Sequence, residues 1–99
     1  MIHVLAIITA KPGKRGTLLD AFRAIVPAVH AEAGCIEYGP VVDVPNAEPA
    51  LGPDTFVVVE KWDSMAALKA HAAAPHMAAY GERTKDLVAK RAVHVLTPA

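Results

Sequence analysis

Two runs of apolar residues limit what this chain can fold into. "IHVLAIIT" (Ile2–Thr9) and "TFVVVEKW" (Thr55–Trp62) are rich in β-branched residues and apolar at almost every position. Such a pattern predicts strands that are covered on both faces. The 99 residues are expected to form a single domain, residues 1–99, which can hide only about 60 to 70% of its unfolded surface. Few other elements are therefore available to cover these strands.

After the first run, the hydrophobic period changes to that of a helix. From about Lys14 to Ala33, apolar residues recur every three or four positions, while Asp20, Arg23 and Glu32 lie off this stripe. The stripe consists of Leu18, Phe22, Ile25 and Val29. We expect Thr17 and Asp20 to form a capping pair for this helix, and Gly34 to end it.

Two more strands and a long loop are predicted from composition. Cys35–Val44 is read as a strand, and Pro40 within it favours a position at a sheet edge or at a bulge. Pro45–Asp54 has three prolines and no periodicity, which predicts a long loop. Ala92–Thr97 is read as the last strand.

The second helical region is split by a proline. In "HAAAPHMAAY" (His71–Tyr80), the proline would break a helix interior but is tolerated at a first helical position. We therefore predict one helix, capped by Asp63 or Ser64, that ends near Ala73, and a second from Pro75 to about Lys90. The residues expected to face inward from the second helix are Met77, Tyr80, Thr84, Leu87 and Val88.

The element order strand, helix, strand, strand, helix, strand predicts an α+β fold. Right-handed crossovers place both helical regions on one face of an antiparallel sheet. The other face would then expose apolar side chains over several hundred Å², which is unstable in water for a monomer. A second copy related by a twofold axis is the expected cover. This argument places a ligand in the space between the two facing sheets.

Charge and cysteine content exclude several classes of function. Ten basic and ten acidic residues leave a formal net charge of zero, so neither nucleic acid nor an anionic membrane is an expected partner. The apolar start lacks the features of a signal peptide and is too short to span a bilayer, so a cytoplasmic location is expected. Cys35, the only cysteine, is expected to be a buried small hydrophobe rather than a reactive thiol.

Three segments in this order resemble the antibiotic biosynthesis monooxygenase domain: "GCIEY" (Gly34–Tyr38), "FVVVEKWDS" (Phe56–Ser64) and "ALKAHAAAPHM" (Ala67–Met77). Within that family, the bacterial quinol monooxygenase-like group is the most similar, and the resemblance covers essentially the whole chain. It implies a ferredoxin-like βαββαβ subunit that forms a dimeric α+β barrel. It also implies oxidation of a small aromatic quinol-like or anthrone-like substrate by molecular oxygen, with no cofactor. The loop Pro45–Asp54 departs from the family pattern and puts the shape of the substrate in question.

Such chemistry needs a base, donors for the phenolate oxygens and a dry apolar chamber. Histidine is the residue type most often used as a base near neutral pH. His76 and His71 flank the helix break, so either is a candidate base; helix-end packing is the other reading of both. Glu60 is a carboxylate in an apolar strand and needs a partner. It is expected to form a structural ion pair or to orient a catalytic histidine.

Four further residues are candidates for substrate binding. Trp62 could stack on a flat substrate or belong to the core or a dimer interface. Tyr80 and Arg83 follow His76 by four and seven positions and so share its helical face. Arg83 could equally lie on a solvated face. Met77 is placed with them in the pocket.

Alternatives remain open at this stage. A metal site at Glu60, His71 and His76 matches no zinc spacing. Relatives that degrade haem carry an iron-ligating histidine that aligns with Gly81, which argues against haem. A non-catalytic, stress-associated dimer that binds an apolar metabolite is the main rival to an enzyme, and an isomerase that moves a proton in the same pocket is a third reading.

Overall fold

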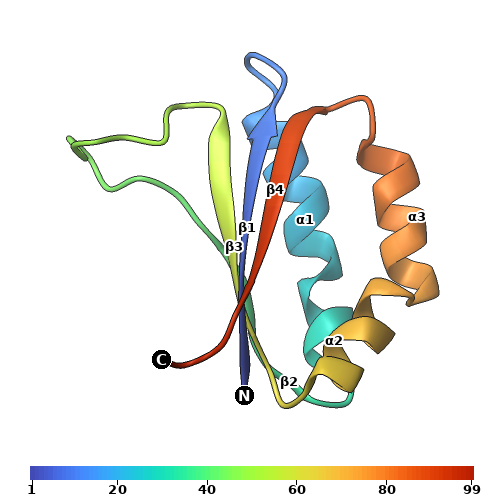
Figure 1. Ribbon diagram of the computed structural model, residues 1–99. Helices are drawn as coiled ribbons and strands as arrows, with labels where there is room; N and C mark the ends of the chain where they lie inside the picture. The colour runs from blue at the N-terminus through green and yellow to red at the C-terminus, as the bar shows by residue number, and fades with distance from the viewer.

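The two apolar runs form the two central strands of a four-stranded antiparallel sheet. The computed structural model describes residues 1–99, and its sheet has the order β2-β3-β1-β4. The strands are β1 (Ile2–Ala10), β2 (Cys35–Val41), β3 (Thr55–Trp62) and β4 (Val88–Leu96). The helices are α1 (Arg15–His30), α2 (Met65–Ala72) and α3 (Pro75–Thr84), and all three lie on one side of the sheet (Figure 1). This arrangement is the predicted ferredoxin-like βαββαβ fold, with the second crossover helix broken in two.

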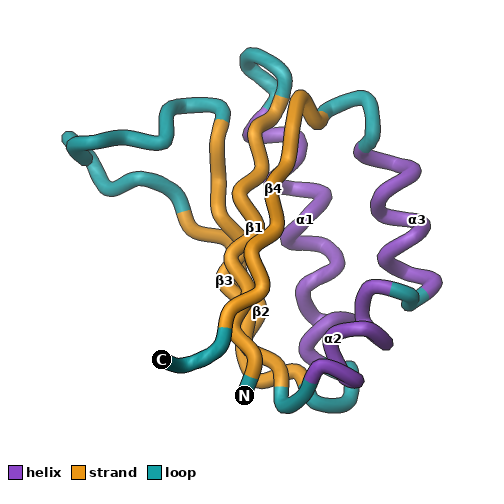
Figure 2. The backbone as a smooth tube through the Cα atoms, in the orientation of Figure 1, coloured by secondary structure: helices purple, strands orange, loops and turns teal.

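The helices cover one side of the sheet and leave the other side open (Figure 2), and the residues of the strands alternate between these two sides. On β3, Phe56, Val58, Glu60 and Trp62 are buried, whereas the residues between them are only half-buried. The strand β2 pairs only with β3 and is therefore an edge strand, as Pro40 predicted.

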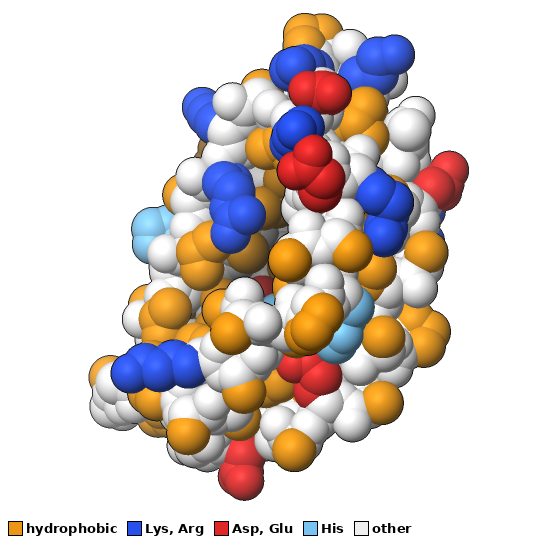
Figure 3. Space-filling view, turned by 90° about the vertical axis from the view of Figure 1, so that its right-hand side faces the viewer, with side chains coloured by type: hydrophobic (Ala, Val, Ile, Leu, Met, Phe, Trp, Pro, Cys, Tyr) orange, Lys and Arg blue, Asp and Glu red, His pale blue; other side chains and the backbone are white.

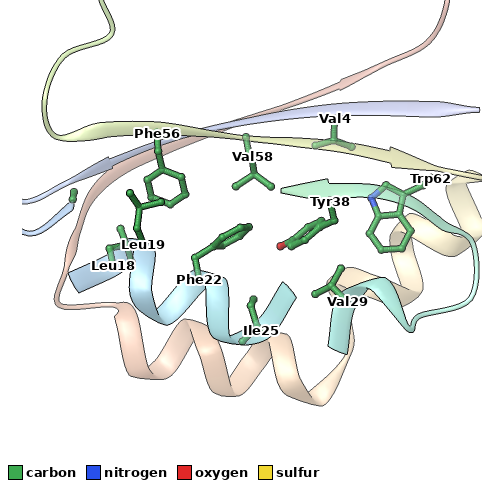
Figure 4. Close-up of a cluster of buried hydrophobic side chains, with 12 residues drawn as sticks. Val4, Leu18, Leu19, Phe22, Ile25, Val29, Tyr38, Phe56, Val58 and Trp62 are labelled. Atoms are coloured by element: carbon green, nitrogen blue, oxygen red, sulfur yellow. The ribbon is translucent and has the colours of Figure 1, made fainter. Parts of the chain in front are cut away.

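The core lies between α1 and the central strands (Figure 4). Phe22 of α1 stacks on Tyr38 of β2 with ring centroids 5.3 Å apart and lies 5.7 Å from Phe56 of β3. Leu18 and Val29 of the predicted helical stripe are fully buried. Complete burial of an apolar side chain of this size stabilises the fold by about 1.5–3 kcal/mol, so this stripe holds α1 on the sheet.

The turn between α1 and β2 is packed directly against α2. Gly34 has φ of +83°, and a Cβ built on it would lie 2.6 Å from the Cβ of Ala67. Its carbonyl oxygen accepts a hydrogen bond from the backbone N–H of Asp63 at 2.8 Å. Only glycine combines this backbone conformation with so close an approach, so Gly34 seats α2. The prediction that Gly34 ends the first helix is wrong, because α1 already ends at His30 with Ala31 as its C-cap, and Gly34 lies in the turn that leads into β2.

The proline break forms as predicted. Ser64 caps α2, since its Oγ accepts from the N–H of Ala67 at 3.1 Å. Pro75 occupies the first turn of α3, where it has no intrahelical donor to lose. The helix α3 then packs against α1 instead of lying over β4, whose residues after Val88 are all exposed.

The boundary between the last helix and the last strand was wrongly predicted. α3 ends at Thr84 rather than near Lys90, and β4 begins at Val88 rather than Ala92. Val88 pairs with Ala10, and the carbonyl of Leu87 accepts from the N–H of Lys11 at 2.8 Å. The pairing requirement of β1 therefore outweighs the apparent helical period of this segment.

Smaller differences concern caps and strand ends. The helix α1 follows Lys14 with no side-chain cap, so the predicted capping pair of Thr17 and Asp20 is wrong. β2 ends at Val41, which lengthens the loop to residues 42–54; this loop projects away from the helix side (Figure 1). The carboxylate of Asp43 holds the two ends of this loop together by accepting two backbone N–H hydrogen bonds, which lower the pKa of Asp43.

No helix combines the length and apolar character required to cross a membrane.

Candidate active site

The main pocket lies between the helix side of the sheet and the helices α2 and α3. Its volume is about 540 Å³, within the usual range for small-molecule sites, and 14 of its 20 lining residues are hydrophobic. In a space-filling view of the helix side, the surface is hollowed near its centre, with acidic and histidine atoms visible at the bottom (Figure 3). This pocket is formed within one subunit, whereas the sequence argument placed a ligand between two facing sheets; that second placement stays a prediction.

His71 of α2 lies at the inner end of this pocket and is held by Glu32 of the α1–β2 turn. Its Nδ1 lies 3.2 and 3.0 Å from the two carboxylate oxygens of Glu32. An ionised carboxylate can only accept, so this geometry places a proton on Nδ1, and in the neutral imidazole Nε2 is then an acceptor. No buried side-chain nitrogen or oxygen lacks a hydrogen-bond partner. Nε2 of His71 has no partner within the chain and is therefore not fully buried, and His71 is one of the residues that line the pocket.

His76 completes a bridge centred on Glu32. Its Nε2 lies 2.8 Å from Oε2 of Glu32, so one carboxylate accepts from both histidines. The side chain of Glu32 is 15% exposed, that of His71 7% and that of His76 35%. Because Pro75 redirects the chain between the two histidines, α2 and α3 both converge on the turn that follows α1.

Aromatic rings fix the orientation of the His71 imidazole. The indole of Trp62 lies with its centroid 4.6 Å from that of His71, and the Tyr38 ring meets His71 edge-on at 5.3 Å. Trp62 is fully buried and Tyr38 is 5% exposed. The imidazole therefore has one rotamer defined by packing and one tautomer defined by Glu32, as a positioned base requires.

Glu60 is held by the indole of Trp62 and not by a histidine. The Nε1–H of Trp62 donates to Oε1 of Glu60 at 2.9 Å. Burial raises the pKa of Glu60, whereas the indole hydrogen bond and a positive charge on His71, which exists only when the imidazole is protonated, oppose this rise. Glu60 lines the pocket, so a carboxyl group with elevated pKa lies beside the imidazole of His71.

The two tyrosines of the pocket remain phenols. Burial raises the pKa of Tyr38 and of Tyr80, and the negative charge of Glu60 raises that of Tyr38 further. Each can therefore offer an O–H group to a bound oxygen atom across the physiological pH range.

No group of three or more His, Cys, Asp or Glu side chains is arranged to hold a metal ion.

Comparison with known proteins shows which family this chain resembles. The sequence profile of the family described as "Antibiotic biosynthesis monooxygenase" matches residues 1–83. The chain belongs to this monooxygenase family. It is 40% identical to the Escherichia coli K12 protein named "Probable quinol monooxygenase YgiN", over 99% of this chain and 98% of that protein.

Solved structures agree with this assignment. PA3566 from Pseudomonas aeruginosa superposes with a TM-score of 0.84 at 28% identity, covering 99% of this chain and 93% of that one. Rv0793 from Mycobacterium tuberculosis gives a TM-score of 0.82 at 26% identity, covering 99% and 94%. The resemblance drawn from the three sequence segments is thus confirmed at the level of the family and the fold.

Within this monooxygenase fold, the predicted site residues separate into two groups. Four of them line the pocket: Glu60, His71, Met77 and Tyr80. Three of them lie outside it: Trp62, His76 and Arg83. Trp62 contacts His71 from within the core, His76 reaches it only through Glu32, and Arg83 is exposed on α3.

Sequence reasoning missed two residues that define the site. Glu32 was set aside because it lies off the apolar stripe, although it holds both histidines. Tyr38 was quoted only as part of a family segment, yet it contacts His71 and lines the pocket. The one available signal for Glu32 is its position two residues before Gly34, in a turn that must meet α2.

Proposed function

We propose that this protein is a cofactor-independent monooxygenase that oxidises a small quinol-like or anthrone-like aromatic with molecular oxygen. The observation that carries the proposal is the setting of His71. Its Nδ1 is held by Glu32 while its Nε2 remains free beside an apolar pocket. Similarity to a protein named as a quinol monooxygenase supports the substrate class.

The proposed reaction begins with proton transfer from a substrate hydroxyl or acidic C–H group to Nε2 of His71. The Glu32 carboxylate stabilises the imidazolium that forms. The resulting anion is electron-rich and reduces oxygen directly, and the apolar walls exclude water from the radical pair. One oxygen atom enters the substrate and the other leaves as water with two hydrogens of the substrate, so no external reductant is required.

Oxygen uptake tests this function directly. We expect the purified protein to accelerate oxygen consumption with menadiol or a simple anthrone, with one labelled atom from ¹⁸O₂ in the product. Heat-denatured protein and superoxide dismutase control for autoxidation of the substrate. An uptake equal to autoxidation across the panel would exclude the monooxygenase; binding without turnover would favour the apolar-metabolite carrier, and conversion without oxygen an isomerase.

We further infer that two copies of the chain associate through the open side of the sheet. Leu5 is 38%, Val41 48% and Leu96 44% exposed on this side, and half-buried Ile7 and Val57 lie between them. An apolar surface of this kind is typical of an interface between copies.

Replacing Leu5 with lysine should convert a dimer into a single chain in solution. A charged side chain near the centre of the open side would be desolvated without a partner if the two sheets met. Light scattering at micromolar protein concentration reads the mass, and Met65→Lys on exposed α2 serves as the matched control. A wild-type mass of one chain, or a dimer that survives Leu5→Lys, would contradict this interface.

A further inference from the structure

The pocket has an arginine at its outer rim that no other part of the site explains. Arg91 of β4 lies opposite Ile8 of β1, on the helix side of the sheet, and lines the pocket. Its neighbour Lys90 pairs with Thr9 and therefore points to the open side. A Lys or Arg side chain is visible at the rim of the hollow in Figure 3.

Arg91 has no partner within the protein, unlike several other cations of the chain. Arg15 donates to the carbonyl of Thr55, and Lys61 pairs with Glu37. The second cation of the pocket, Lys85, pairs with Glu82 at 2.7 Å. No hydrogen bond or ion pair involves the guanidinium of Arg91, so its donors remain available to a ligand.

The charge of Arg91 acts on the interior of the pocket. It lowers the pKa of Glu60 and of Tyr80, in opposition to the effect of burial on both groups. The register agrees with this influence, because it places Arg91, although exposed, on the helix side of the sheet among the residues that line the pocket. A free cation therefore faces an otherwise largely apolar space.

We propose that Arg91 binds an anionic substituent, such as a carboxylate, of the aromatic molecule that occupies this pocket. The guanidinium presents paired N–H donors that match a carboxylate in a bidentate arrangement. This inference rests on the proposed function only in taking an aromatic ligand for the same pocket. It adds the substrate class: a phenol or quinol with an acidic group at the end remote from His71.

The spacing of the strands defines the length of such a ligand. Glu60, next to His71, pairs with Val4, and Arg91 pairs with Ile8. Four residues along β1 correspond to about 13 Å between these two rows, and the arginine side chain shortens this span. A ligand of two fused rings with a hydroxyl at one end and a carboxylate at the other fits this separation.

Anaerobic binding of two matched ligands tests the proposal without any turnover. The ligands are 6-hydroxy-2-naphthoate and its carboxamide, which differ in charge but hardly in shape. We expect the wild type to bind the carboxylate about tenfold more tightly, as measured by calorimetry, because a hydrogen bond to a charged group contributes more than one to a neutral group. Arg91→Gln should abolish this preference.

Lys69→Gln provides the matched control, since it makes the same change of net charge on exposed α2 without touching the pocket lining. It should leave the preference intact. Equal affinity of the wild type for both ligands, no detectable binding of the carboxylate, or a preference that persists in Arg91→Gln would each overturn the proposal. Oxygen uptake with neutral quinols is independent of this result, so failure here and failure of the monooxygenase assignment can be distinguished.

Discussion

Replacement of His71 by alanine is expected to reduce kcat of the oxygen-dependent reaction by about 10²- to 10⁴-fold, the usual contribution of a positioned general base. Nε2 of His71 is the acceptor that remains free beside the pocket once Glu32 holds Nδ1. Initial rates of oxygen uptake at saturating substrate give this number. His71→Gln, which preserves more of the buried volume between Trp62 and Tyr38, distinguishes loss of the base from loss of packing.

Two comparisons sharpen the test of His71. Glu32→Gln should lower kcat with little change in KM, because Glu32 positions the imidazole but does not line the pocket. His76→Ala should cause a much smaller loss, because His76 is partly exposed and reaches the site only through Glu32. Full activity in both His71 variants, or a loss in His76→Ala as large as that in His71→Ala, would refute His71 as the base.

Replacement of Trp62 by alanine should lower the free energy of unfolding by about 3–5 kcal/mol, as for other large core truncations. Trp62 is fully buried, contacts His71 and donates to Glu60. Urea unfolding at fixed protein concentration measures the change, and Met65→Ala on the exposed surface of α2 should have little effect. A change below 1 kcal/mol in Trp62→Ala would show that the indole is not a principal core residue.

The variant Trp62→Phe isolates the hydrogen bond to Glu60. Burial raises the pKa of Glu60 in the folded state, so the unfolded chain releases this proton more readily and stability falls as pH rises between the unfolded and folded pKa values. Without the indole N–H, the folded pKa should rise further. The destabilisation by Trp62→Phe should therefore be larger at pH 8 than at pH 5. An equal loss at both pH values would contradict this role of the hydrogen bond.

The sequence predicts those parts of the fold in which local pattern and tertiary demand agree. β3 has the predicted bounds because Thr55–Trp62 is apolar on both faces and lies in the sheet interior. The break at Pro75 is also as predicted, since proline has few alternatives in a helix. The start of β4 was misplaced because Leu87 and Val88 fit a helical stripe equally well, and only pairing with β1 decides between the two states.

The site was less predictable than the fold because its contacts are long-range. The histidines were recognised by their chemistry, but their partner Glu32 is 39 residues from His71 in the chain and belongs to a different element. Glu60 was assigned to orient a histidine, whereas its hydrogen bond goes to a residue two positions away. The spacing of residues along a helix or strand shows which side chains lie on the same face and can therefore contact one another. Only the packing of the turn at Gly34 against α2 decides which of these contacts form.

The close approach at Gly34 has a consequence for how the active centre could diversify. The hydrogen atom of this residue lies where any larger substituent would collide with Ala67, one helical turn before His71. A bulkier residue would push the whole second helix outward and separate the imidazole from its carboxylate. The absence of a side chain at Gly34 thus sets the distance between the imidazole of His71 and its carboxylate partner. A substitution at this position would impair the chemistry of the site before it disrupted the fold.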